Sequence, residues 1–298
     1  MWPGVDQDLW SMKHWLITTE HLEDRLLFKD IEDFIVGMNH LAIQSHRCAV
    51  IVLAFILMSN HIHIVVEGNR EDVETFITML KLVYSKYLAA KYNTREHLRR
   101  LKVDIRPISD DDEALERAIA YVQMNCVAAN ICATPYEYPW GTGSSFFKLS
   151  EVKGTQLGEF SARARYKLLH CKTDVPLNWI VCEEGYIIPT SYVNTKFVER
   201  LFRTPKRMNY FLQSSSKAKQ RVETMEEGLP AFRDQVVYAA LPDLCRSLFG
   251  KISVKELTEN QLIELLRQLR FRFAASVNQI ARVVGLSYAE AAEYLDKA

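Results

Sequence analysis

An almost unbroken apolar run at residues 49–58 ends just before two histidines that flank one aliphatic residue. The run AVIVLAFILM is typical of a central strand, and the segment SNHIHI follows it directly. Successive side chains of a strand point to opposite faces, so His61 and His63 share one face and Ile62 and Ile64 share the other. The sequence therefore predicts a β-sheet that carries two imidazoles on one of its faces. Two neutral imidazoles make half of a metal site.

A phenol and an amide oxygen lie four residues apart further along the chain. Tyr121 and Asn125 fall in a segment that reads as a helix over 110–129, where this spacing places both on one face. Ser109 and the three aspartates after it predict the start of that helix, because carboxylates favour the positive end of the helix dipole.

These two motifs together suggest metal-assisted phosphodiester chemistry. A divalent ion bound by His61, His63 and the side-chain oxygen of Asn125 would keep open positions for a phosphate. Such a mixed nitrogen and oxygen set suits Mg²⁺ or Mn²⁺, and zinc remains an alternative. Tyr121 would then attack the phosphate and form a covalent phosphotyrosine. Each motif alone is common in proteins without any such role.

The pattern of elements predicts an α+β fold. Strands are expected at 14–19, 48–58, 62–67 and 103–106, and helices at 31–44, 70–92 and 110–129. Asn69 is the expected cap of the second helix. This order predicts a ferredoxin-like antiparallel sheet with helices on one face, within a first domain at 1–150.

Two further blocks follow. Residues 151–230 form an accessory or linker region with a helix near 195–202 and a flexible joint at 213–217. Residues 231–298 are expected to be helical. Ser276 and Gln279 fit a capping box, Gly285 a left-handed stop, and Ser287 a second cap. Two short helices so joined predict a helix-turn-helix, which binds DNA or serves as a structural cap.

Charge is balanced over the whole chain but not along it. The 37 basic and 37 acidic residues cancel, which argues mildly against nucleic acid as a partner. Residues 81–107, however, carry eight basic against two acidic residues, and residues 196–221 carry eight against one, mixed with aromatics. Such stretches suit a phosphate backbone with unstacked bases, although a solvated helix face is the plainer alternative. The expected DNA-binding residues are Lys81, Lys86, Lys91, Arg95, Arg99, Arg100, Arg200, Arg203, Lys206 and Arg207.

No apolar run approaches the length of a membrane helix, and the first residues lack the pattern of a secretory signal. The six cysteines show no paired CxxC spacing. A reduced, cytoplasmic chain is the simplest expectation.

Three segments in order resemble the REP-associated tyrosine transposases, a branch of the HUH single-tyrosine transposases. MSNHIHI at 58–64 is similar to the family's M-P-N-H-hydrophobe-H segment, and AYVQMN at 120–125 to its Y-I-x-x-N segment. YEYPW at 136–140, followed by two serines, is similar to the Y-P-W-S-S segment that closes the domain. The resemblance implies an HUH catalytic domain with Tyr121 as nucleophile and Asn125 completing the metal site.

By the same resemblance, the substrate would be single-stranded DNA bearing a hairpin, cleaved and rejoined without ATP. A homodimer is compatible with this expectation. The chain departs from the family pattern at four positions: Ser59 and Cys126 replace prolines, Ala128 an arginine and Asn130 a glycine. None of these changes removes a group expected to touch the metal or the phosphate.

Alternatives remain at both the residue and the functional level. Tyr84 and Tyr87 on the second helix compete for the role of nucleophile, although Tyr84 falls in the apolar stripe. A non-catalytic nucleic-acid-binding regulator would keep the fold without the reaction. A zinc-dependent hydrolase would cleave without a covalent adduct.

Overall fold

A four-stranded antiparallel sheet lies at the centre of the protein, whose structure is a computed structural model. The structure describes residues 13–19, 26–93, 101–111, 113–129, 131–148, 153–172, 174–218 and 232–297. The strands are β1 (Lys13–Thr19), β2 (Ile51–Met58), β3 (His61–Gly68) and β4 (Val103–Pro107), in the order β2-β3-β1-β4. With helices α1 (Ile31–Arg47) and α2 (Arg70–Tyr92), this is the ferredoxin-like order, and the expected fold class is confirmed.

The strand register brings the histidine motif to the middle of the sheet. A turn at Ser59 and Asn60 joins β2 to β3, with Met58 opposite His61. On its other side β3 pairs with β1, where Thr18 is opposite His63. Both β2 and β3 are buried along almost their whole length. The central position predicted for β2 is wrong, because β2 is an edge strand of the four-stranded sheet; it can still be fully apolar because the segment around Gly141 covers its outer edge.

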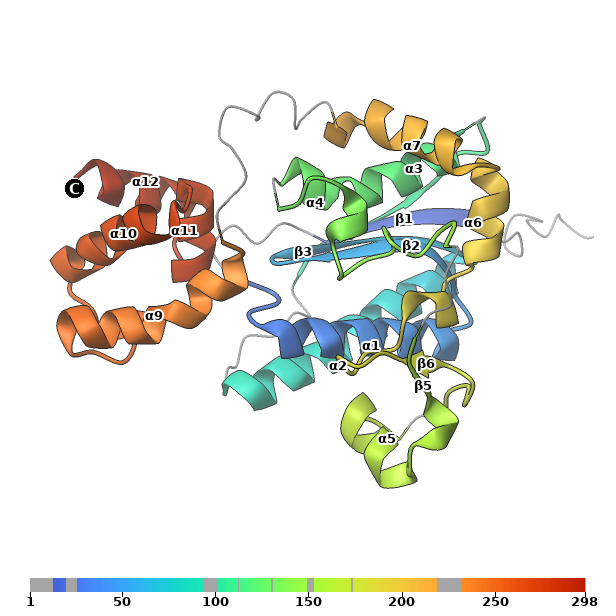
Figure 1. The fold of residues 1–298 in the computed structure, drawn as a ribbon, viewed down its shortest axis with the longest axis horizontal. Coiled ribbons are helices and arrows are strands. Elements are labelled where there is room, and N and C mark those ends of the chain that lie inside the picture. The colour runs from blue at the N-terminus through green and yellow to red at the C-terminus, as the bar shows by residue number, and fades with distance from the viewer. Residues whose placement is uncertain are drawn as a thin grey trace, which may run out of the picture.

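Helices cover both faces of this sheet (Figure 1). The expected layer, α1 and α2, lies on one face. The other face carries α3 (Ala114–Gln123) and α4 (Asn125–Ala128), which pack on β2 and β3. Asn69 caps α2 as expected, because its side-chain oxygen accepts from Asp72 N at 2.9 Å.

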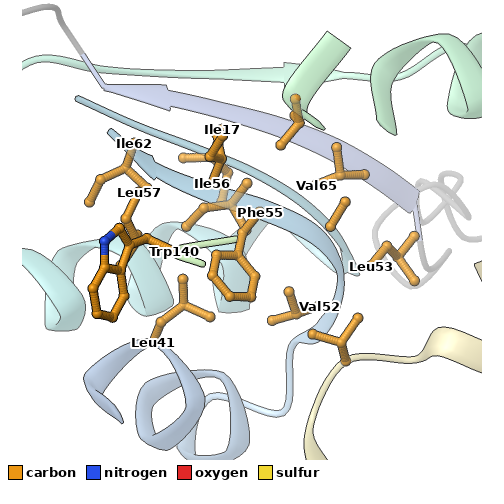
Figure 2. Close-up of a cluster of buried hydrophobic side chains, with 14 of the residues drawn as sticks. Ile17, Leu41, Val52, Leu53, Phe55, Ile56, Leu57, Ile62, Val65 and Trp140 are labelled. Atoms are coloured by element: carbon orange, nitrogen blue, oxygen red, sulfur yellow. The ribbon is translucent and has the colours of Figure 1, made fainter. Parts of the chain in front are cut away.

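The main hydrophobic core lies between the sheet and α1. Figure 2 shows Phe55 of β2 and Trp140 beside Leu41 of α1. Trp140 belongs to a segment that extends the edge of β2: its carbonyl accepts from Leu57 N at 2.8 Å, and Thr142 N donates to Phe55 O at 3.0 Å. The YPW segment therefore covers the outer edge of β2 with backbone hydrogen bonds. Gly141 allows the approach, since a Cβ there would lie 2.9 Å from Phe55 O.

The helix expected at 110–129 starts later than the sequence suggests and is interrupted. Ser109 Oγ donates to Asp111 Oδ2 at 2.9 Å instead of capping a helix, and α3 begins only after Glu113, whose φ is 69°. The helix breaks at Met124, between α3 and α4. The start predicted at Ser109 is thus wrong, because a local side-chain bond competes with the cap.

The middle block packs partly into the main core and partly into a small core of its own with α1, in which Leu169 and Trp179 lie against Ile43. It contains β5 (Thr155–Gln156), α5 (Ala162–Leu169), β6 (Ile180–Val181), α6 (Thr195–Phe202) and α7 (Pro205–Ser214). The helix expected near 195–202 is confirmed, and Val198, Phe202 and Phe211 join the core of the first block. The flexible joint predicted at 213–217 is wrong, because α7 continues through Ser214 and residues 216–218 are again helical after a bend at Ser215.

The C-terminal helices form a second core. They are α9 (Asp234–Phe249), α10 (Glu259–Phe273), α11 (Val277–Val284) and α12 (Tyr288–Asp296), packed around Leu241, Leu265 and Ile280. Gly285 ends α11 with φ 85°, and Ser287 forms a capping box with Glu290, so the predicted turn between two short helices is confirmed. Half of the capping box predicted at Ser276 is confirmed, because Ser276 Oγ accepts from Gln279 N at 3.3 Å. The other half is wrong: the Gln279 side chain bonds to Phe232 O at 2.8 Å instead of returning to the Ser276 N–H.

No helix within the described residues combines the length and the apolar character needed to cross a membrane. The six cysteines are all free thiols.

Candidate functional site

The two histidines of β3 lie side by side on the sheet face that α3 covers. Their ring centroids are 4.8 Å apart at an interplanar angle of 82°, and both side chains are buried. The Nδ1 atom of each ring has a polar neighbour. His61 Nδ1 lies 2.8 Å from Asn60 Oδ1, and His63 Nδ1 lies 3.1 Å from Thr18 Oγ1. An amide oxygen can only accept, so His61 donates from Nδ1, and its neutral ring then has its lone pair on Nε2.

Tyr121 packs against this pair from α3. Its ring centroid lies 5.4 Å from that of His63 at 83°, an edge-to-face contact. Tyr121 is half-buried, and this burial raises the pKa of its phenol, while the charge of Arg106 acts in the opposite direction. Lys217 Nζ lies 5.2 Å from the centroid of the Tyr121 ring, a cation–π contact. The phenol is therefore bounded by an imidazole and an ammonium group.

Asn125 lies one turn after Tyr121 and is buried, with 3% of its surface exposed. Its amide nitrogen donates to Tyr121 O at 2.8 Å and to Val122 O at 3.2 Å. These carbonyls are the ones that the backbone N–H groups of a regular helix would use at this point, and this competition accounts for the break at Met124. Both bonds hold the amide nitrogen against the helix, so the side-chain oxygen is the atom that remains for a ligand.

The sequence placed Tyr121 and Asn125 on one face of a continuous helix. In the structure Tyr121 is half-buried and Asn125 is fully buried. The break at Met124 changes the helix after Tyr121, and the chain there packs against β2. Among the described residues, no three His, Cys, Asp or Glu side chains come together in a way that could hold a metal ion.

The competing tyrosines lie on the opposite face of the sheet from the histidine pair, on α2 (Figure 1). Tyr84 is buried and its hydroxyl donates to Leu27 O at 3.1 Å. The hydroxyl of Tyr87 donates to Asp33 Oδ1 at 2.8 Å. Both phenols hold α2 against the start of α1, and neither accompanies the imidazoles.

The basic residues expected to bind DNA fall into distinct environments. Lys91 lies within 2.7–2.9 Å of the carboxylates of Asp30, Glu32 and Asp33. Lys81 donates to Leu101 O, and burial lowers its pKa. Lys86 is exposed on α2, on the sheet face opposite Tyr121. Arg95, Arg99 and Arg100 lie outside the described residues.

Of the second basic segment, α7 lies over α3, on the same side of the sheet as Tyr121, whereas α6 stands beside the edge strand β2 (Figure 1). Arg200, Arg203 and Lys206 are exposed on α6 and at the start of α7. Arg207 instead pairs with two glutamates, with its guanidinium 3.1 Å from Glu113 and 3.2 Å from Glu116. This pair ties α7 to α3, so Arg207 has a structural partner that phosphate would have to displace.

Sequence reasoning missed three neighbours of the site. Thr18 reaches His63 from another strand, and Lys217 reaches Tyr121 from the segment after α7. Neither contact could be predicted from the sequence pattern, because the two partners are distant along the chain. Asn60, in contrast, directly precedes the first histidine and could have been chosen as its partner.

Comparison with known proteins finds a family that part of the chain resembles. Residues 8–102 match the family model described as IS200-like transposase, roughly a third of the chain, including His61 and His63 but not Tyr121 or Asn125. The resemblance to transposases expected from the motifs is confirmed over this segment. Among solved structures, a REP-associated tyrosine transposase bound to a REP hairpin is similar, with 9% identity and a TM-score of 0.38. The similarity covers 58% of this chain and 96% of that chain. No curated protein matches.

Proposed function

We propose that this protein, which matches the IS200-like transposases over residues 8–102, is a DNA strand transferase with Tyr121 as its nucleophile. It would cleave and rejoin single-stranded DNA through a covalent phosphotyrosine, at hairpin-bearing repeats. One observation carries the proposal: the Tyr121 ring packs 5.4 Å from that of His63, although the two belong to different elements and are far apart along the chain.

The donor groups fit a divalent cation of the Mg²⁺ or Mn²⁺ type. Because the Nδ1 atoms of His61 and His63 face Asn60 and Thr18, an ion would be bound through Nε2. Because the amide nitrogen of Asn125 bonds to α3, the third ligand would be its oxygen. When bound, such an ion polarises the scissile phosphate and offsets its developing negative charge.

Tyr121 performs the transfer. Its oxygen forms a bond to phosphorus while the bond from phosphorus to the departing sugar oxygen breaks, and that oxygen takes up a proton. The reverse step restores the phenol and rejoins the strand, so the bond energy is kept and no ATP is required. A phenol, with an ordinary pKa of about 10, is protonated at neutral pH, and burial raises the pKa of Tyr121 further, so its proton has to leave during the attack.

Exposed cations of α6 and α7 would hold the substrate. Arg200, Arg203 and Lys206, which are exposed, would contact the phosphates of a strand that approaches α3. Lys91 and Arg207 contribute less in this proposal, since carboxylates already bind them. A homodimer remains compatible with the arrangement.

The proposal is tested with a labelled hairpin-bearing oligonucleotide and Mn²⁺. The wild-type protein should form an adduct that survives denaturant, and Tyr121→Phe should abolish it. Tyr210→Phe is the matched control, because Tyr210 is an exposed tyrosine on α7, 65% accessible, and should leave the adduct unchanged.

Two other results would overturn the proposal, each in favour of another function. Tight binding of intact DNA without metal and without adduct would identify a regulator that keeps only the fold. Hydrolysis without adduct that survives Tyr121→Phe would identify a metal-dependent hydrolase.

A further inference from the structure

A shallow hollow of about 360 Å³ lies on the surface of α5, away from the site described above. Its lining consists of Arg163, Tyr166, Lys167 and His170. The volume is within the range of small-molecule sites, about 300–1,000 Å³. The sequence analysis assigned nothing to this helix.

The hollow follows from the pattern of one short helix. Ser161 caps α5 by accepting from Ala164 N at 3.2 Å. The four lining residues are spaced i, i+3, i+4 and i+7, so they form one stripe. All four are exposed, and Tyr166 is 51% accessible. An exposed phenol ring is thus flanked by two permanent cations.

The charge of this surface is of one sign. Residues 160–172 contain two arginines and two lysines and no acidic residue. Within the part of the chain that the structure describes, neither Arg163 nor Lys167 forms an ion pair. Lys91 and Arg207, in contrast, are bound by carboxylates. The cations of α5 therefore keep their full attraction for an external anion.

The helix is firmly attached behind this surface. Leu169 is buried in a small core with Ile43 and Trp179. Asn39 of α1 donates to Leu168 O at 3.4 Å, and the His170 ring lies 6.1 Å from that of Tyr87. The lining side chains thus project from a fixed backbone, which limits the ordering cost of binding.

In Figure 1, α5 lies beyond α1, on the opposite side of the sheet from α3 and Tyr121. The hollow is therefore separate from the proposed cleavage site. A ligand here would contact the protein through phosphates and a flat ring, because cations and an aromatic face are what the surface offers.

We propose that this α5 surface (Arg163, Tyr166, Lys167 and His170) binds single-stranded nucleic acid. Arg163 and Lys167 contact successive phosphates, and a base stacks on Tyr166. The identification of the strand as the unpaired DNA next to a hairpin rests on the proposed function. The surface would act as a second anchor and would not take part in the reaction.

The test measures equilibrium binding of the full chain to a labelled hairpin with and without a single-stranded tail. Arg163→Glu/Lys167→Glu should weaken binding of the tailed DNA at least tenfold and leave the tailless hairpin nearly unchanged. Removing two phosphate contacts should also lower the salt slope by about 1.4, at about 0.7 for each contact. The matched control is Arg246→Glu/Lys255→Glu, with the same change of charge at two exposed positions in the C-terminal helices.

The aromatic part is tested separately. Tyr166→Ala should weaken binding of the tailed DNA roughly fivefold or more, and Tyr166→Phe should retain it, because stacking needs only the ring. These residues are exposed, so circular dichroism should show the same fold in each variant.

Three outcomes would overturn the inference. The Arg163→Glu/Lys167→Glu variant could bind the tailed DNA as tightly as the wild-type protein, or the control variant could lose as much affinity. The variant could also lose binding to anionic lipid vesicles while keeping its binding to the tailed DNA. Covalent adduct formation at saturating DNA separates this inference from the proposed function. The α5 variants should keep the adduct, whereas Tyr121→Phe should lose it and keep tail-dependent binding.

Discussion

At the scale of single residues, the candidate site depends on neighbours that orient it. Thr18 Oγ1 lies 3.1 Å from His63 Nδ1, so in the proposed site Nε2 would be the ring nitrogen left for an ion. Such outer contacts commonly change metal affinity or activity by about 10–100-fold when they are removed. The histidine alone is not sufficient in this view, because an unheld ring can turn.

Thr18→Val keeps the shape of the side chain and removes the hydroxyl. We expect adduct formation at limiting Mn²⁺ to fall by about tenfold or more, with partial recovery at high Mn²⁺. We expect this recovery because the substitution weakens the affinity for the metal but leaves Tyr121 in place. A Mn²⁺ titration of the adduct rate measures this effect, and an unchanged midpoint would contradict it.

A second residue-scale feature is His40, a buried histidine of α1. Desolvation lowers its pKa to about 4, and the charge of the nearby His170 adds to this effect. The unfolded chain, with a pKa of about 6.5, takes up the proton first as the pH falls. The contribution of His40 to the free energy of unfolding is therefore constant above about pH 6.5 and decreases as the pH falls from about 6.5 to 4.

We expect this group to cost about 2 kcal/mol of unfolding free energy between pH 7 and pH 5. His40→Leu removes the titratable imidazole and replaces it with an apolar side chain of similar size. Urea unfolding at the two pH values measures the difference. If the wild-type protein and the variant lose equal stability, the burial of a neutral His40 is not the cause.

At the scale of elements, local side-chain bonds decide where helices begin and end. Asn125 interrupts its helix by donating to Tyr121 O and Val122 O, and Ser109 fails to start one because it bonds to Asp111. Both effects arise from short polar side chains that compete with the backbone. Where such a side chain instead accepts from a helix N–H, as Asn69 does, the predicted boundary is correct.

Asn69→Ala tests this on α2. The substitution removes the acceptor for Asp72 N, and we expect a loss of about 1 kcal/mol of unfolding free energy. Asn69→Ser should retain most of the stability, because a hydroxyl also caps. Urea denaturation of the three proteins gives the comparison, and equal losses for Ala and Ser would argue against capping.

At the scale of the whole molecule, a few contacts among the described residues join the main core to the core of the C-terminal helices. Leu26, just before α1, packs in the core of the C-terminal helices. Gln235 donates to Phe28 O at 3.1 Å, and Lys29 Nζ lies 5.9 Å from the centroid of the Tyr238 ring. The C-terminal helices are therefore connected to the first block through the segment that leads into α1.

We expect Gln235→Ala/Tyr238→Ala to separate the unfolding of the two cores, since so few contacts connect them. Calorimetry should show the transitions further apart in temperature than in the wild-type protein. Tyr288→Ala serves as control, because Tyr288 is an exposed residue of α12. A scan that matches the wild-type protein would show that the two cores are coupled by other contacts.

The sequence by itself determined what depends on local periodicity. A period of two placed His61 and His63 on one face, and helical spacing predicted α1, α2 and α6 nearly to their ends. The order of these elements was enough for the antiparallel sheet and its class.

Only the tertiary structure decided what depends on partners distant along the chain. It placed α3 on the sheet face of the histidines, with Tyr121 beside His63. It also showed that carboxylates bind Lys91 and Arg207, whereas the cations of α5 have no such neighbours among the described residues. The physical reason is that spacing along a chain reports which face a side chain occupies, whereas charge neutralisation and packing depend on what folds against that face.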